Sequence, residues 1–419
     1  GRVLIGGFVL LLLTRVPISF AMLLATLGSA LVTGTNFSVL VRQMVDGANN
    51  FSLLSIPFFI VMGEFMSAGG ISEKIVDLAN LAVGRFRGGL AYVNVLDSMF
   101  FGGISGSAVA TVAAIGGMTI PAMKDEGYDP DYSAALASAA SLLGPMIPPS
   151  ITLIVYAGLT DASVQKLFLA TLTPAIACTV AFLVYTLWYG KKKNLPKQPK
   201  KTLKEAFKIM LDAIWALLLP VIVLGLIFSG ITTVTEAAAI SCLYSAIVSL
   251  FIYKTITFKD LLKILGDSAV SIAAIMILVG MSKATAYVVI SSQMPQLFMG
   301  FITSFTSSRF VVLLILNLIF LLLGCLMEGN CIIVMMVPLL LTLVKSFGID
   351  LLQFGVMAAI NIYIGCITPP VGVSLLLGSK LGKTSIGGTF KAILPFLGIS
   401  MVILILVTYW PSFTLWLIH

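Results

Sequence analysis

Two proline-rich breaks interrupt apolar segments of this chain and constrain its fold more than any other feature. The first break is Gly144-Pro145-Met146-Ile147-Pro148-Pro149-Ser150, and the second is Gly365-Cys366-Ile367-Thr368-Pro369-Pro370-Val371-Gly372. A small-residue turn precedes each, Gly103-Ile104-Ser105-Gly106-Ser107 and Met327-Glu328-Gly329-Asn330. Non-helical backbone is tolerated at membrane depth only where protein or a water-filled cavity satisfies its N–H and C=O groups. A repeated pair of such breaks therefore points to the binding site of a secondary transporter.

Composition places nearly the whole chain in a bilayer. Of its 419 residues, 59% are hydrophobic and only 10% are charged, whereas soluble domains carry about 25% charged residues. The longest polar stretch runs from Lys191 to Lys204, and the formal net charge of +8 comes largely from this stretch and other short loops. Such charge is typical of cytoplasmic loops. The sequence has no basic face with interleaved aromatic residues, so it does not indicate nucleic-acid binding.

Residues for catalysis or metal chelation are missing from the sequence. The cysteines Cys178, Cys242, Cys325, Cys331 and Cys366 lie in apolar segments without a C-x-x-C pair, so neither a disulfide framework nor a metal cluster is expected. The single histidine is the last residue, which excludes a histidine-based metal site or catalytic triad. Metalloprotease and phosphate-loop motifs are also missing. We therefore predict that the chain is not an enzyme.

The hydropathy pattern predicts an all-α polytopic membrane protein with about ten spans and two re-entrant helical hairpins. Spans are expected near 3–14, 17–34, 53–69, 131–158, 163–190, 211–230, 233–254, 268–291, 351–380 and 389–410. The stretches 86–123 and 309–347 each fold at a polar, glycine-bearing middle, and we interpret them as hairpins with tips near the midplane. Amphipathic stretches at 37–48 and 257–266 are expected to lie in the membrane interface as struts.

The order of these elements predicts an inverted-topology repeat. Pro148 and Pro369 are 221 residues apart, and the order span, hairpin, broken helix, span occurs twice. Positive charge places the mouth of the first hairpin in the cytoplasm and the mouth of the second outside. We predict a first repeat in 1–190, a basic cytoplasmic linker in 191–203 and a second repeat in 204–419.

Four short motifs occur in a fixed order along the chain. They are Phe101–Ala108, Gly144–Ser150, Thr233–Ala239 and Thr368–Gly372. Together they resemble the large membrane subunit of tripartite ATP-independent periplasmic (TRAP) transporters, and the resemblance covers essentially the whole chain. It implies Na⁺-driven uptake of an organic acid across the bacterial inner membrane, with sialic acid favoured over a C4-dicarboxylate. It also implies a periplasmic substrate-binding protein and a small four-helix membrane subunit as partners, and an elevator mechanism in which hairpins and broken helices move against a scaffold.

Unwound backbone at each tip and break offers the oxygen ligands that a sodium ion needs. The predicted sodium site 1 comprises Gly102, Gly103, Ser105, Ser107, Gly144, Pro145 and Pro148. The predicted sodium site 2 comprises Gly324, Cys325, Glu328, Gly365, Cys366, Thr368 and Pro369. Half-helix N-termini beyond the tips present free N–H groups to an anion, so the predicted substrate-binding residues are Ser107, Thr152, Asn330 and Glu328. The alternatives are that Ser-Gly-Ser serves close helix packing and that Thr152 bonds its own i−4 carbonyl.

Ionisable residues inside spans are costly and are functional by default. Glu328, at the second tip, is predicted to neighbour sodium or to gate the anion. Glu236 either acts in transport or accepts backbone N–H groups at a helix start. Lys283 either pairs with Glu64, meets the substrate or extends to the surface.

One position departs from the family pattern. Family members are expected to carry an acid a few residues after Ser-Gly-Ser, where this chain has Thr111. Asp97 lies in the opposite hairpin arm, and Asp97 and Thr111 are equidistant from residue 104. We therefore hypothesise that the carboxylate has moved across the arms, so that Asp97 faces Thr111 and is functional.

The main alternative function is a stand-alone sodium–dicarboxylate symporter of similar architecture. Such a protein would need neither a binding protein nor a small subunit. A channel would need a continuous polar pore, whereas polarity in this chain is concentrated at two tips. An ATP-driven permease would need a nucleotide-binding partner, and the paired hairpins favour gradient coupling instead.

Overall fold

Every regular element of the computed structural model is helical within the residues that it describes, 2–14, 16–197 and 201–418. Among these, seven helices are long and apolar enough to cross a bilayer, or eight if one bent pair counts as a single span. The bent pair is Pro130–Met146 with Ile151–Thr160, which meet at 42° across the first predicted break. The predicted all-α membrane fold is therefore confirmed. Residues 198–200 of the predicted linker lie outside the described part.

The first half of the chain contains one hairpin and one broken helix. Its helices are α1 (Arg2–Leu13), α2 (Ile18–Thr33), α3 (Phe37–Ala48), the 3₁₀ turn η1 (Phe51–Leu54), α4 (Ser55–Ala68), α5 (Ile71–Val83), α6 (Gly89–Ser105), α7 (Ala108–Thr111), the π-helical turn η2 (Val112–Gly116), α8 (Gly117–Asp125), α9 (Pro130–Ala140), α10 (Leu143–Met146), α11 (Ile151–Thr160) and α12 (Val164–Lys192). Helix α6 and the run α7–η2–α8 are the arms of the first hairpin. Helices α9, α10 and α11 form the first broken helix.

The second half repeats this order. Its helices are α13 (Leu203–Ser229), α14 (Val234–Ile247), the π-helical turn η3 (Val248–Ile252), α15 (Phe258–Ser291), α16 (Met294–Phe305), α17 (Arg309–Gly324), α18 (Gly329–Ser346), α19 (Leu351–Cys366), α20 (Val373–Gly382), α21 (Ile386–Tyr409) and α22 (Pro411–Leu415). Helices α17 and α18 form the second hairpin. Helices α19 and α20 form the second broken helix.

Local backbone features recur between the halves at an offset of 221 or 222 residues. They include the helix N-caps Asp129 and Asp350, the N-caps Ser163 and Ser385, the left-handed residues Asp161 and Lys383, and the cis bonds Pro148–Pro149 and Pro369–Pro370. An N-cap side chain accepts the free N–H groups of a first helical turn, so these residues set equivalent helix starts in both halves. The repeat therefore extends to the detail of how each helix begins and ends.

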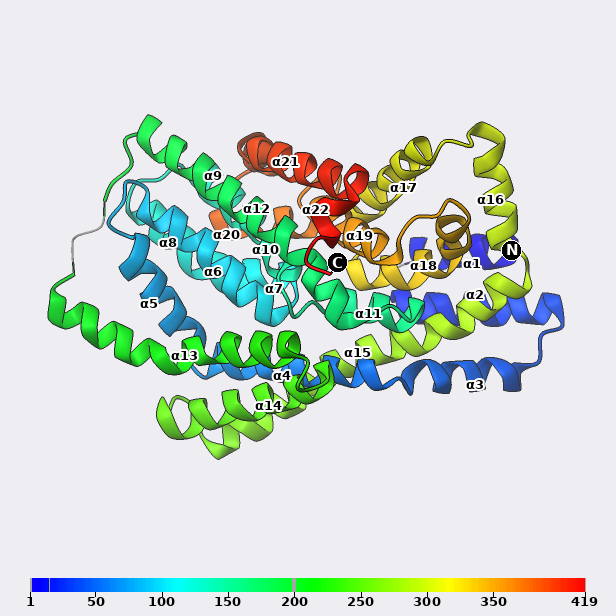
Figure 1. Cartoon of the computed structure of the whole chain (residues 1–419), viewed down its shortest axis with the longest axis horizontal. Coiled ribbons are helices and arrows are strands. Elements are labelled where there is room, and N and C mark those ends of the chain that lie inside the picture. The colour runs from blue at the N-terminus through cyan, green and yellow to red at the C-terminus, as the bar shows by residue number, and fades with distance from the viewer. Residues whose placement is uncertain (1, 15, 198–200, 419) are drawn as a thin grey trace.

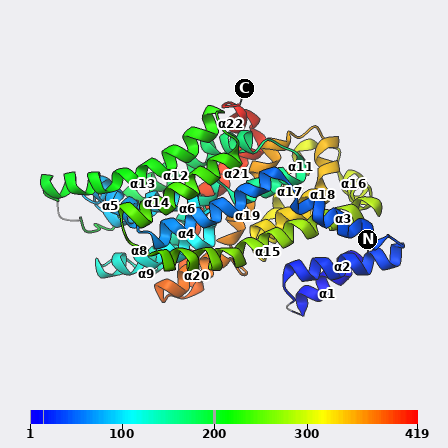
Figure 2. The ribbon, with the colours of Figure 1, turned by 90° about the horizontal axis from the view of Figure 1, so that it is seen from below.

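The helices form an outer layer and a bundle. Helices α3, α4, α13, α14 and α15 run along the lower edge in Figure 1 and cross the face seen from below in Figure 2. In this layer α15 packs on α3, and α14 packs on α4. The bundle holds both hairpins and both broken helices. Helix α11 packs against α18 of the second hairpin, and α20 packs against α9, so each broken helix joins the two halves of the chain.

The predicted struts have different outcomes. The first forms helix α3 with the expected bounds, and its position in the membrane interface stays a prediction. The second was wrong as a separate element, because residues 257–266 continue into the span predicted at 268–291 as the single helix α15. In the first half Asn49 ends α3, and the Asn50 side chain caps the 3₁₀ turn that follows. The second half has no such asparagine pair at the equivalent positions, Val270 and Ser271, so its helix runs on.

Two short helices were missed by sequence reasoning. Helix α5 precedes the first hairpin, and α16 occupies the equivalent place before the second. At 13 and 12 residues they are too short to span a bilayer, so the search for long apolar runs passed over them. Their amphipathic patterns were the available signal.

Candidate functional site

Both hairpin tips and both broken helices contribute to one cavity of about 460 Å³. Its walls are Gly106, Ser107, Ala108, Val109, Ile151, Thr152, Ser271, Ile275, Glu328, Gly329, Asn330, Tyr363, Cys366 and Val373. All four predicted substrate-binding residues are in this set, although they come from three different helix starts. Helix α15 of the outer layer closes one side with Ser271 and Ile275. The structure thus brings the predicted residues together, and their binding of substrate stays a prediction.

A polar network joins the two halves at this cavity. The Thr152 hydroxyl donates to Asn330 Oδ1 at 2.9 Å, and Asn330 Nδ2 donates to Glu328 Oε1 at 2.9 Å. Glu328 is also the N-cap of α18, where Oε2 accepts the Asn330 backbone N–H at 3.1 Å. Thr152 therefore bonds across the repeat, and the alternative in which it bonds its own i−4 carbonyl is wrong. The Asn330 amide therefore orients the Glu328 carboxylate.

Two hydroxyls beside this network were missed by sequence reasoning. Ser150 and Tyr363 are buried, and within the described residues neither hydroxyl oxygen has a hydrogen-bond partner. Tyr363 lines the cavity and lies next to both Ser150 and Thr152. Buried polar atoms of this kind are normally satisfied. Of the two residues only Tyr363 is part of the cavity wall, and Ser150 lies behind it. Ser150 could have been predicted because it is the last residue of the first break motif, whereas no sequence feature pointed to Tyr363.

Direct backbone contact joins the first tip to the first break. A Cβ atom on Gly102 would lie 2.3 Å from Gly144 Cα, and one on Gly103 would lie 2.9 Å from Ile147 Cγ2. Only glycine permits such an approach. Pro145 lies in the short helix α10 and Pro148 in the non-helical break beyond it. The residues of predicted sodium site 1 on the hairpin and on the break are therefore neighbours.

Oxygen atoms gather at this tip. Ser105 Oγ lies 3.4 Å from the Gly102 carbonyl oxygen and 3.5 Å from Thr111 Oγ1, and Thr111 Oγ1 donates to the Ser107 carbonyl at 2.8 Å. Sequence reasoning left the role of Thr111 open, and the structure places its hydroxyl among the predicted site residues. Hydroxyl and carbonyl oxygens suit a hard cation. In the described residues no group of three or more His, Cys, Asp or Glu side chains could hold a metal ion.

The second tip repeats the contact. A Cβ atom on Gly365 would lie 2.5 Å from Gly324 Cα, and this glycine pair is the counterpart of Gly102 and Gly144 at the repeat offset. The Gly372 N–H donates to the Cys325 carbonyl at 3.1 Å, which fastens the break to the tip. The Thr368 hydroxyl donates to the Ile364 carbonyl at 2.7 Å.

Of the remaining residues of predicted sodium site 2, Cys366 and Glu328 line the cavity, and Pro369 lies in the break. The Thr368 oxygen keeps lone pairs for a cation because the hydroxyl donates only its hydrogen.

The predicted meeting of Asp97 with Thr111 is wrong. Asn94 Nδ2 donates to Thr119 Oγ1 across the hairpin at 2.6 Å, and a Cβ on Gly102 would lie 2.8 Å from Thr111 Oγ1. Both pairs are symmetric about the Gly106–Ser107 peptide, not about residue 104. Gly106 has a φ of 63° and Ser107 is the N-cap of α7, so the chain turns between them. Thr111 is therefore opposite Gly102 on the other arm. Gly102 lies five residues beyond Asp97 on α6, which corresponds to about 7.5 Å along the helix axis.

Asp97 is nevertheless deeply buried. Its exposed fraction is 1%, and neither carboxylate oxygen has a hydrogen-bond partner in the described structure. The side chain faces protein, as an intramembrane acid is expected to do, but it does not line the cavity.

The two other predicted functional residues lie away from the cavity. Glu236 forms a capping box with Thr233 at the start of α14: its carboxylate accepts the Thr233 N–H at 2.7 Å, and its own N–H donates to Thr233 Oγ1. Lys283 forms no ion pair with Glu64 in the described structure, so that interpretation is wrong. Its stem packs on Gly47 of α3 instead, and it does not line the cavity.

Comparison with known proteins gives consistent results. Residues 5–413 match the family described as "Tripartite ATP-independent periplasmic transporter, DctM component". The chain is 35% identical over 414 residues to the sialic acid TRAP transporter large permease protein SiaM of Vibrio cholerae, covering 98% of this chain and 96% of that protein. It is 38% identical over 373 residues to the C4-dicarboxylate TRAP transporter large permease protein DctM of Pseudomonas aeruginosa, covering 89% and 87%.

A solved structure shares the fold. The crystal structure of the Alcanivorax borkumensis YdaH transporter superimposes with a TM-score of 0.65 at 16% sequence identity, covering 90% of this chain and 88% of that one. At this identity the likeness concerns the arrangement of helices alone.

Proposed function

Because this chain belongs to the DctM family of tripartite ATP-independent periplasmic transporters, we propose that it takes up an organic acid with a sodium gradient as the driving force. Membership makes it a large permease component embedded in a membrane by several helices, and not an enzyme. We place it in the bacterial inner membrane. The division into repeats at 1–190 and 204–419 stays a prediction.

The observation that carries this proposal is that both hairpin tips and both broken helices line the same cavity. Anions are stabilised at helix N-termini, where free N–H groups and the positive end of the helix dipole lie together. The starts of α7, α11 and α18 all contribute residues to this cavity, at Ala108, Ile151 and Gly329. A carboxylate substrate would therefore find donors from both halves of the repeat.

Sodium coupling follows from the oxygen groups beneath each tip. Cation binding on Ser105, Thr111 and the neighbouring carbonyls would hold the first tip against the first break. A substrate anion would then bind beside fixed positive charge, which makes the two binding events mutually favourable. At the second tip Glu328 would add an anionic ligand that the first tip lacks, and the sodium ion would neutralise it before the substrate carboxylate arrives. Release of sodium on the cytoplasmic side would weaken both interactions.

An elevator mechanism is consistent with the two groups of helices. The bundle would carry the cavity, while α3, α4, α13, α14 and α15 would form the scaffold. Only Ser271 and Ile275 of the scaffold line the cavity among the described residues, so most of the site would travel with the bundle.

We further propose two partners, a small four-helix membrane subunit against the scaffold and a periplasmic protein that delivers the substrate. The named relatives carry sialic acid and C4-dicarboxylates, and both substrates are carboxylates. We favour sialic acid and keep C4-dicarboxylates as the alternative class.

The test is uptake into proteoliposomes that hold this chain and its small subunit. Radiolabelled sialic acid or succinate is supplied outside with the cognate binding protein, with and without an inward sodium gradient. Uptake that needs both sodium and the binding protein supports the tripartite mechanism. Uptake that needs sodium but ignores the binding protein supports the stand-alone symporter, and uptake without sodium rejects the coupling ion.

The predicted first sodium site has its own test in the same assay. Thr111→Val removes a hydroxyl that lies 3.5 Å from Ser105 Oγ, and Thr111→Ser keeps it. We expect the valine variant to raise the sodium concentration for half-maximal uptake by about tenfold, the value of one charge-assisted contact. The serine variant is the matched control and should behave like wild type. Equal sodium dependence of both variants would place the ion elsewhere.

A further inference from the structure

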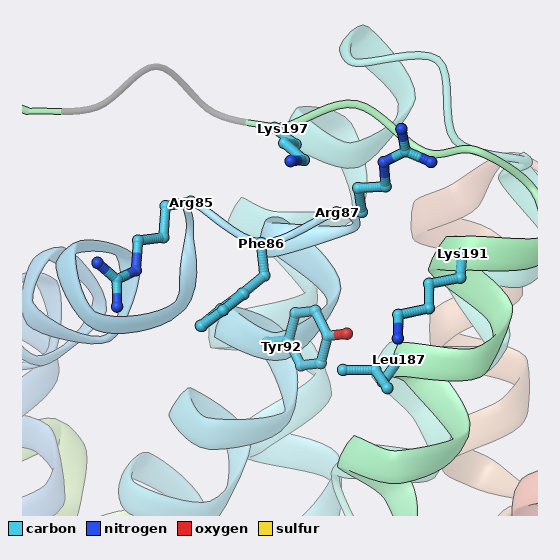
Figure 3. A pocket seen from close by; sticks show the side chains of 7 residues that line it. All are labelled: Arg85, Phe86, Arg87, Tyr92, Leu187, Lys191 and Lys197. Carbon is cyan, nitrogen blue, oxygen red and sulfur yellow. The ribbon is translucent and has the colours of Figure 1, made fainter.

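A basic pocket of about 500 Å³ lies outside the cavity of the hairpin tips, where the α5–α6 loop meets the end of α12 (Figure 3). It is lined by Arg85, Phe86, Arg87, Tyr92, Leu187, Lys191 and Lys197. Four of these seven side chains are cationic and none is acidic. The loop and the end of α12 are the segments whose charge predicts the cytoplasmic side.

These cations lack acidic neighbours. No carboxylate in the described part of the chain lies within ion-pair distance of the four side chains. Arg87 donates to the neutral Asn194 side chain at 2.5 Å, and the Arg85 guanidinium lies over the Phe86 ring at 5.4 Å from its centroid. Like charges that surround one hollow repel each other, so an anion bound among them lowers the electrostatic energy.

Tight backbone packing fixes the loop against α12. The Gly88 N–H donates to the Pro196 carbonyl at 3.1 Å, and a Cβ atom on Gly190 would lie 2.8 Å from the Arg87 carbonyl oxygen. Gly88 has a φ of 80°, which favours glycine. The cationic side chains that line the pocket therefore extend from a backbone that is held by contacts on both sides.

An exposed apolar stripe on α12 leads to the pocket. Its residues are Ile176, Val180, Val184, Leu187 and Trp188, with exposed fractions of 40% to 61%. The spacing of three to four residues puts them on one helix face, and the same spacing continues to Lys191. At the other rim Phe86 is 45% exposed. A ligand with a charged head and apolar chains would contact both the pocket and the stripe, whereas a free phosphate ion would use the pocket alone.

We propose that this pocket binds the phosphate headgroup of an anionic phospholipid of the cytoplasmic leaflet, whose acyl chains lie along the α12 stripe. Guanidinium groups bind phosphate oxygens with two parallel hydrogen bonds, and Arg85 and Arg87 supply two such groups. Lys191 adds a third charge. In Figure 3 the Tyr92 hydroxyl is directed toward α12 and Lys191, where it can donate to the same headgroup. Basic pockets between membrane helices on the cytoplasmic side are typical of such headgroup sites.

The experiment measures lipid-dependent thermal stability of the purified, delipidated full-length chain in detergent. Cardiolipin, phosphatidylglycerol, phosphatidylcholine and inorganic phosphate are each titrated while the melting midpoint is followed. We expect saturable stabilisation by the two anionic lipids and none by phosphatidylcholine or inorganic phosphate. The triple variant R85Q/R87Q/K191Q should weaken the apparent affinity for cardiolipin by on the order of a hundredfold.

The matched control is K193Q, which removes a neighbouring charge that does not line the pocket. It should respond to cardiolipin like wild type. If the triple variant does not fold, the exposed substitutions Val180→Gln and Val184→Gln test the acyl-chain part, and they should weaken the response to cardiolipin severalfold.

Three results would overturn the proposal. The first is an undiminished lipid response in the triple variant. The second is equal stabilisation by inorganic phosphate, which would make the pocket a site for the free ion. The third is displacement of bound cardiolipin by the small membrane subunit, detected by native mass spectrometry, which would make the stripe a protein-docking face.

Discussion

At the scale of single residues, glycines allow the hairpin tips to approach the helix breaks closely, because the neighbouring backbone leaves no room for a side chain at these positions. Gly102 with Gly144 and Gly324 with Gly365 are the same contact in the two halves, and a Cβ on Gly102 or Gly365 would meet backbone at 2.3 or 2.5 Å. The atoms that such a Cβ would meet belong to the backbone, which cannot move aside as a flexible side chain could. From the sequence all four residues were predicted to be sodium ligands, because unwound backbone was expected to leave their carbonyls free, but the sequence could not show that they touch.

Gly102→Ala should therefore destabilise the protein by about 1–3 kcal/mol, as overpacking in a tight core does, and should abolish uptake. Gly117→Ala is the control in the same hairpin, because a Cβ there would meet nothing within 4 Å. Alanine is the better helix former, so the control should melt at or slightly above the wild-type temperature. Thermal unfolding in detergent checks both variants. A wild-type melting temperature for Gly102→Ala would mean that tip and break are not in contact.

Asp97 is the second case at this scale. Asp97 has no hydrogen-bond partner in the described structure. A buried carboxyl group pays free energy either to stay ionised or to take up a proton, and a neutral amide in the same place avoids that cost. Asp97→Asn should therefore raise stability by about 1 kcal/mol. Exposed Asp125 of the same hairpin provides the control, since Asp125→Asn should change stability by less than about 0.5 kcal/mol. If Asp97→Asn melts lower than wild type, the carboxylate has a stabilising partner. Lost uptake in a more stable protein would assign it a functional role.

At the scale of elements, the register of the first hairpin separates what the sequence could predict from what it could not. The hairpin at 86–123 was predicted nearly as observed, because polar glycine-bearing residues between two apolar runs can only form a turn. The position of the turn was placed at residue 104 instead of between Gly106 and Ser107. The position of the turn depends on which serine caps the second arm. Ser105 ends α6 and Ser107 caps α7, and the sequence alone does not distinguish these two serines.

This register is testable by a double-mutant cycle. Asn94 and Thr119 share a hydrogen bond of 2.6 Å across the arms, so Asn94→Ala and Thr119→Ala should be coupled by about 1 kcal/mol. Asp97→Ala and Thr111→Ala should be additive within about 0.5 kcal/mol, because these residues are not opposite each other. Free energies from reversible unfolding of the four single and two double variants decide the matter. Coupling between Asp97 and Thr111, with none between Asn94 and Thr119, would instead show that the turn is centred on residue 104.

The struts show the same limit in another form. Periodicity predicted α3 with its observed bounds, since Asn36 starts it and Asn49 ends it. At 257–266 the same periodicity had a start signal at Thr257 and no stop. The repeat suggested that this helix would end near residue 266, as α3 ends at the equivalent place in the first half. That expectation was wrong because a helix end depends on local capping residues and not on symmetry.

At the scale of the whole molecule, the repeat explains why one cavity has two tips. Each broken helix packs on an element of the other half, α11 on α18 and α20 on α9. Neither half can therefore complete the cavity alone, and the Thr152–Asn330 hydrogen bond joins the two halves at its wall. Sequence reasoning could predict this pairing in outline, since equal spacing implied equivalent breaks. The direction of the side chains that join them required coordinates.

The proposed elevator makes a prediction about the boundary between bundle and scaffold. Val109 at the first tip and Ile275 of α15 line the same cavity from opposite sides of that boundary. If the bundle moves against α15, a Val109→Cys/Ile275→Cys pair bridged by a cleavable bifunctional thiol reagent should lose more than about 90% of uptake, and reduction should restore it. The background must lack the natural cysteines, because Cys366 lines this cavity too.

The control bridge lies within the bundle. Asn317 of α17 and Met357 of α19 are 3.6 Å apart, Nδ2 to Sδ, so an Asn317→Cys/Met357→Cys bridge joins two helices that would travel together. It should leave uptake close to that of the unbridged double variant. Full uptake with the Val109–Ile275 bridge intact would show that the first tip does not move relative to α15. The cavity would then have to open by movement of the second hairpin alone, because the tip of that hairpin also lines the cavity, with Glu328 and Asn330.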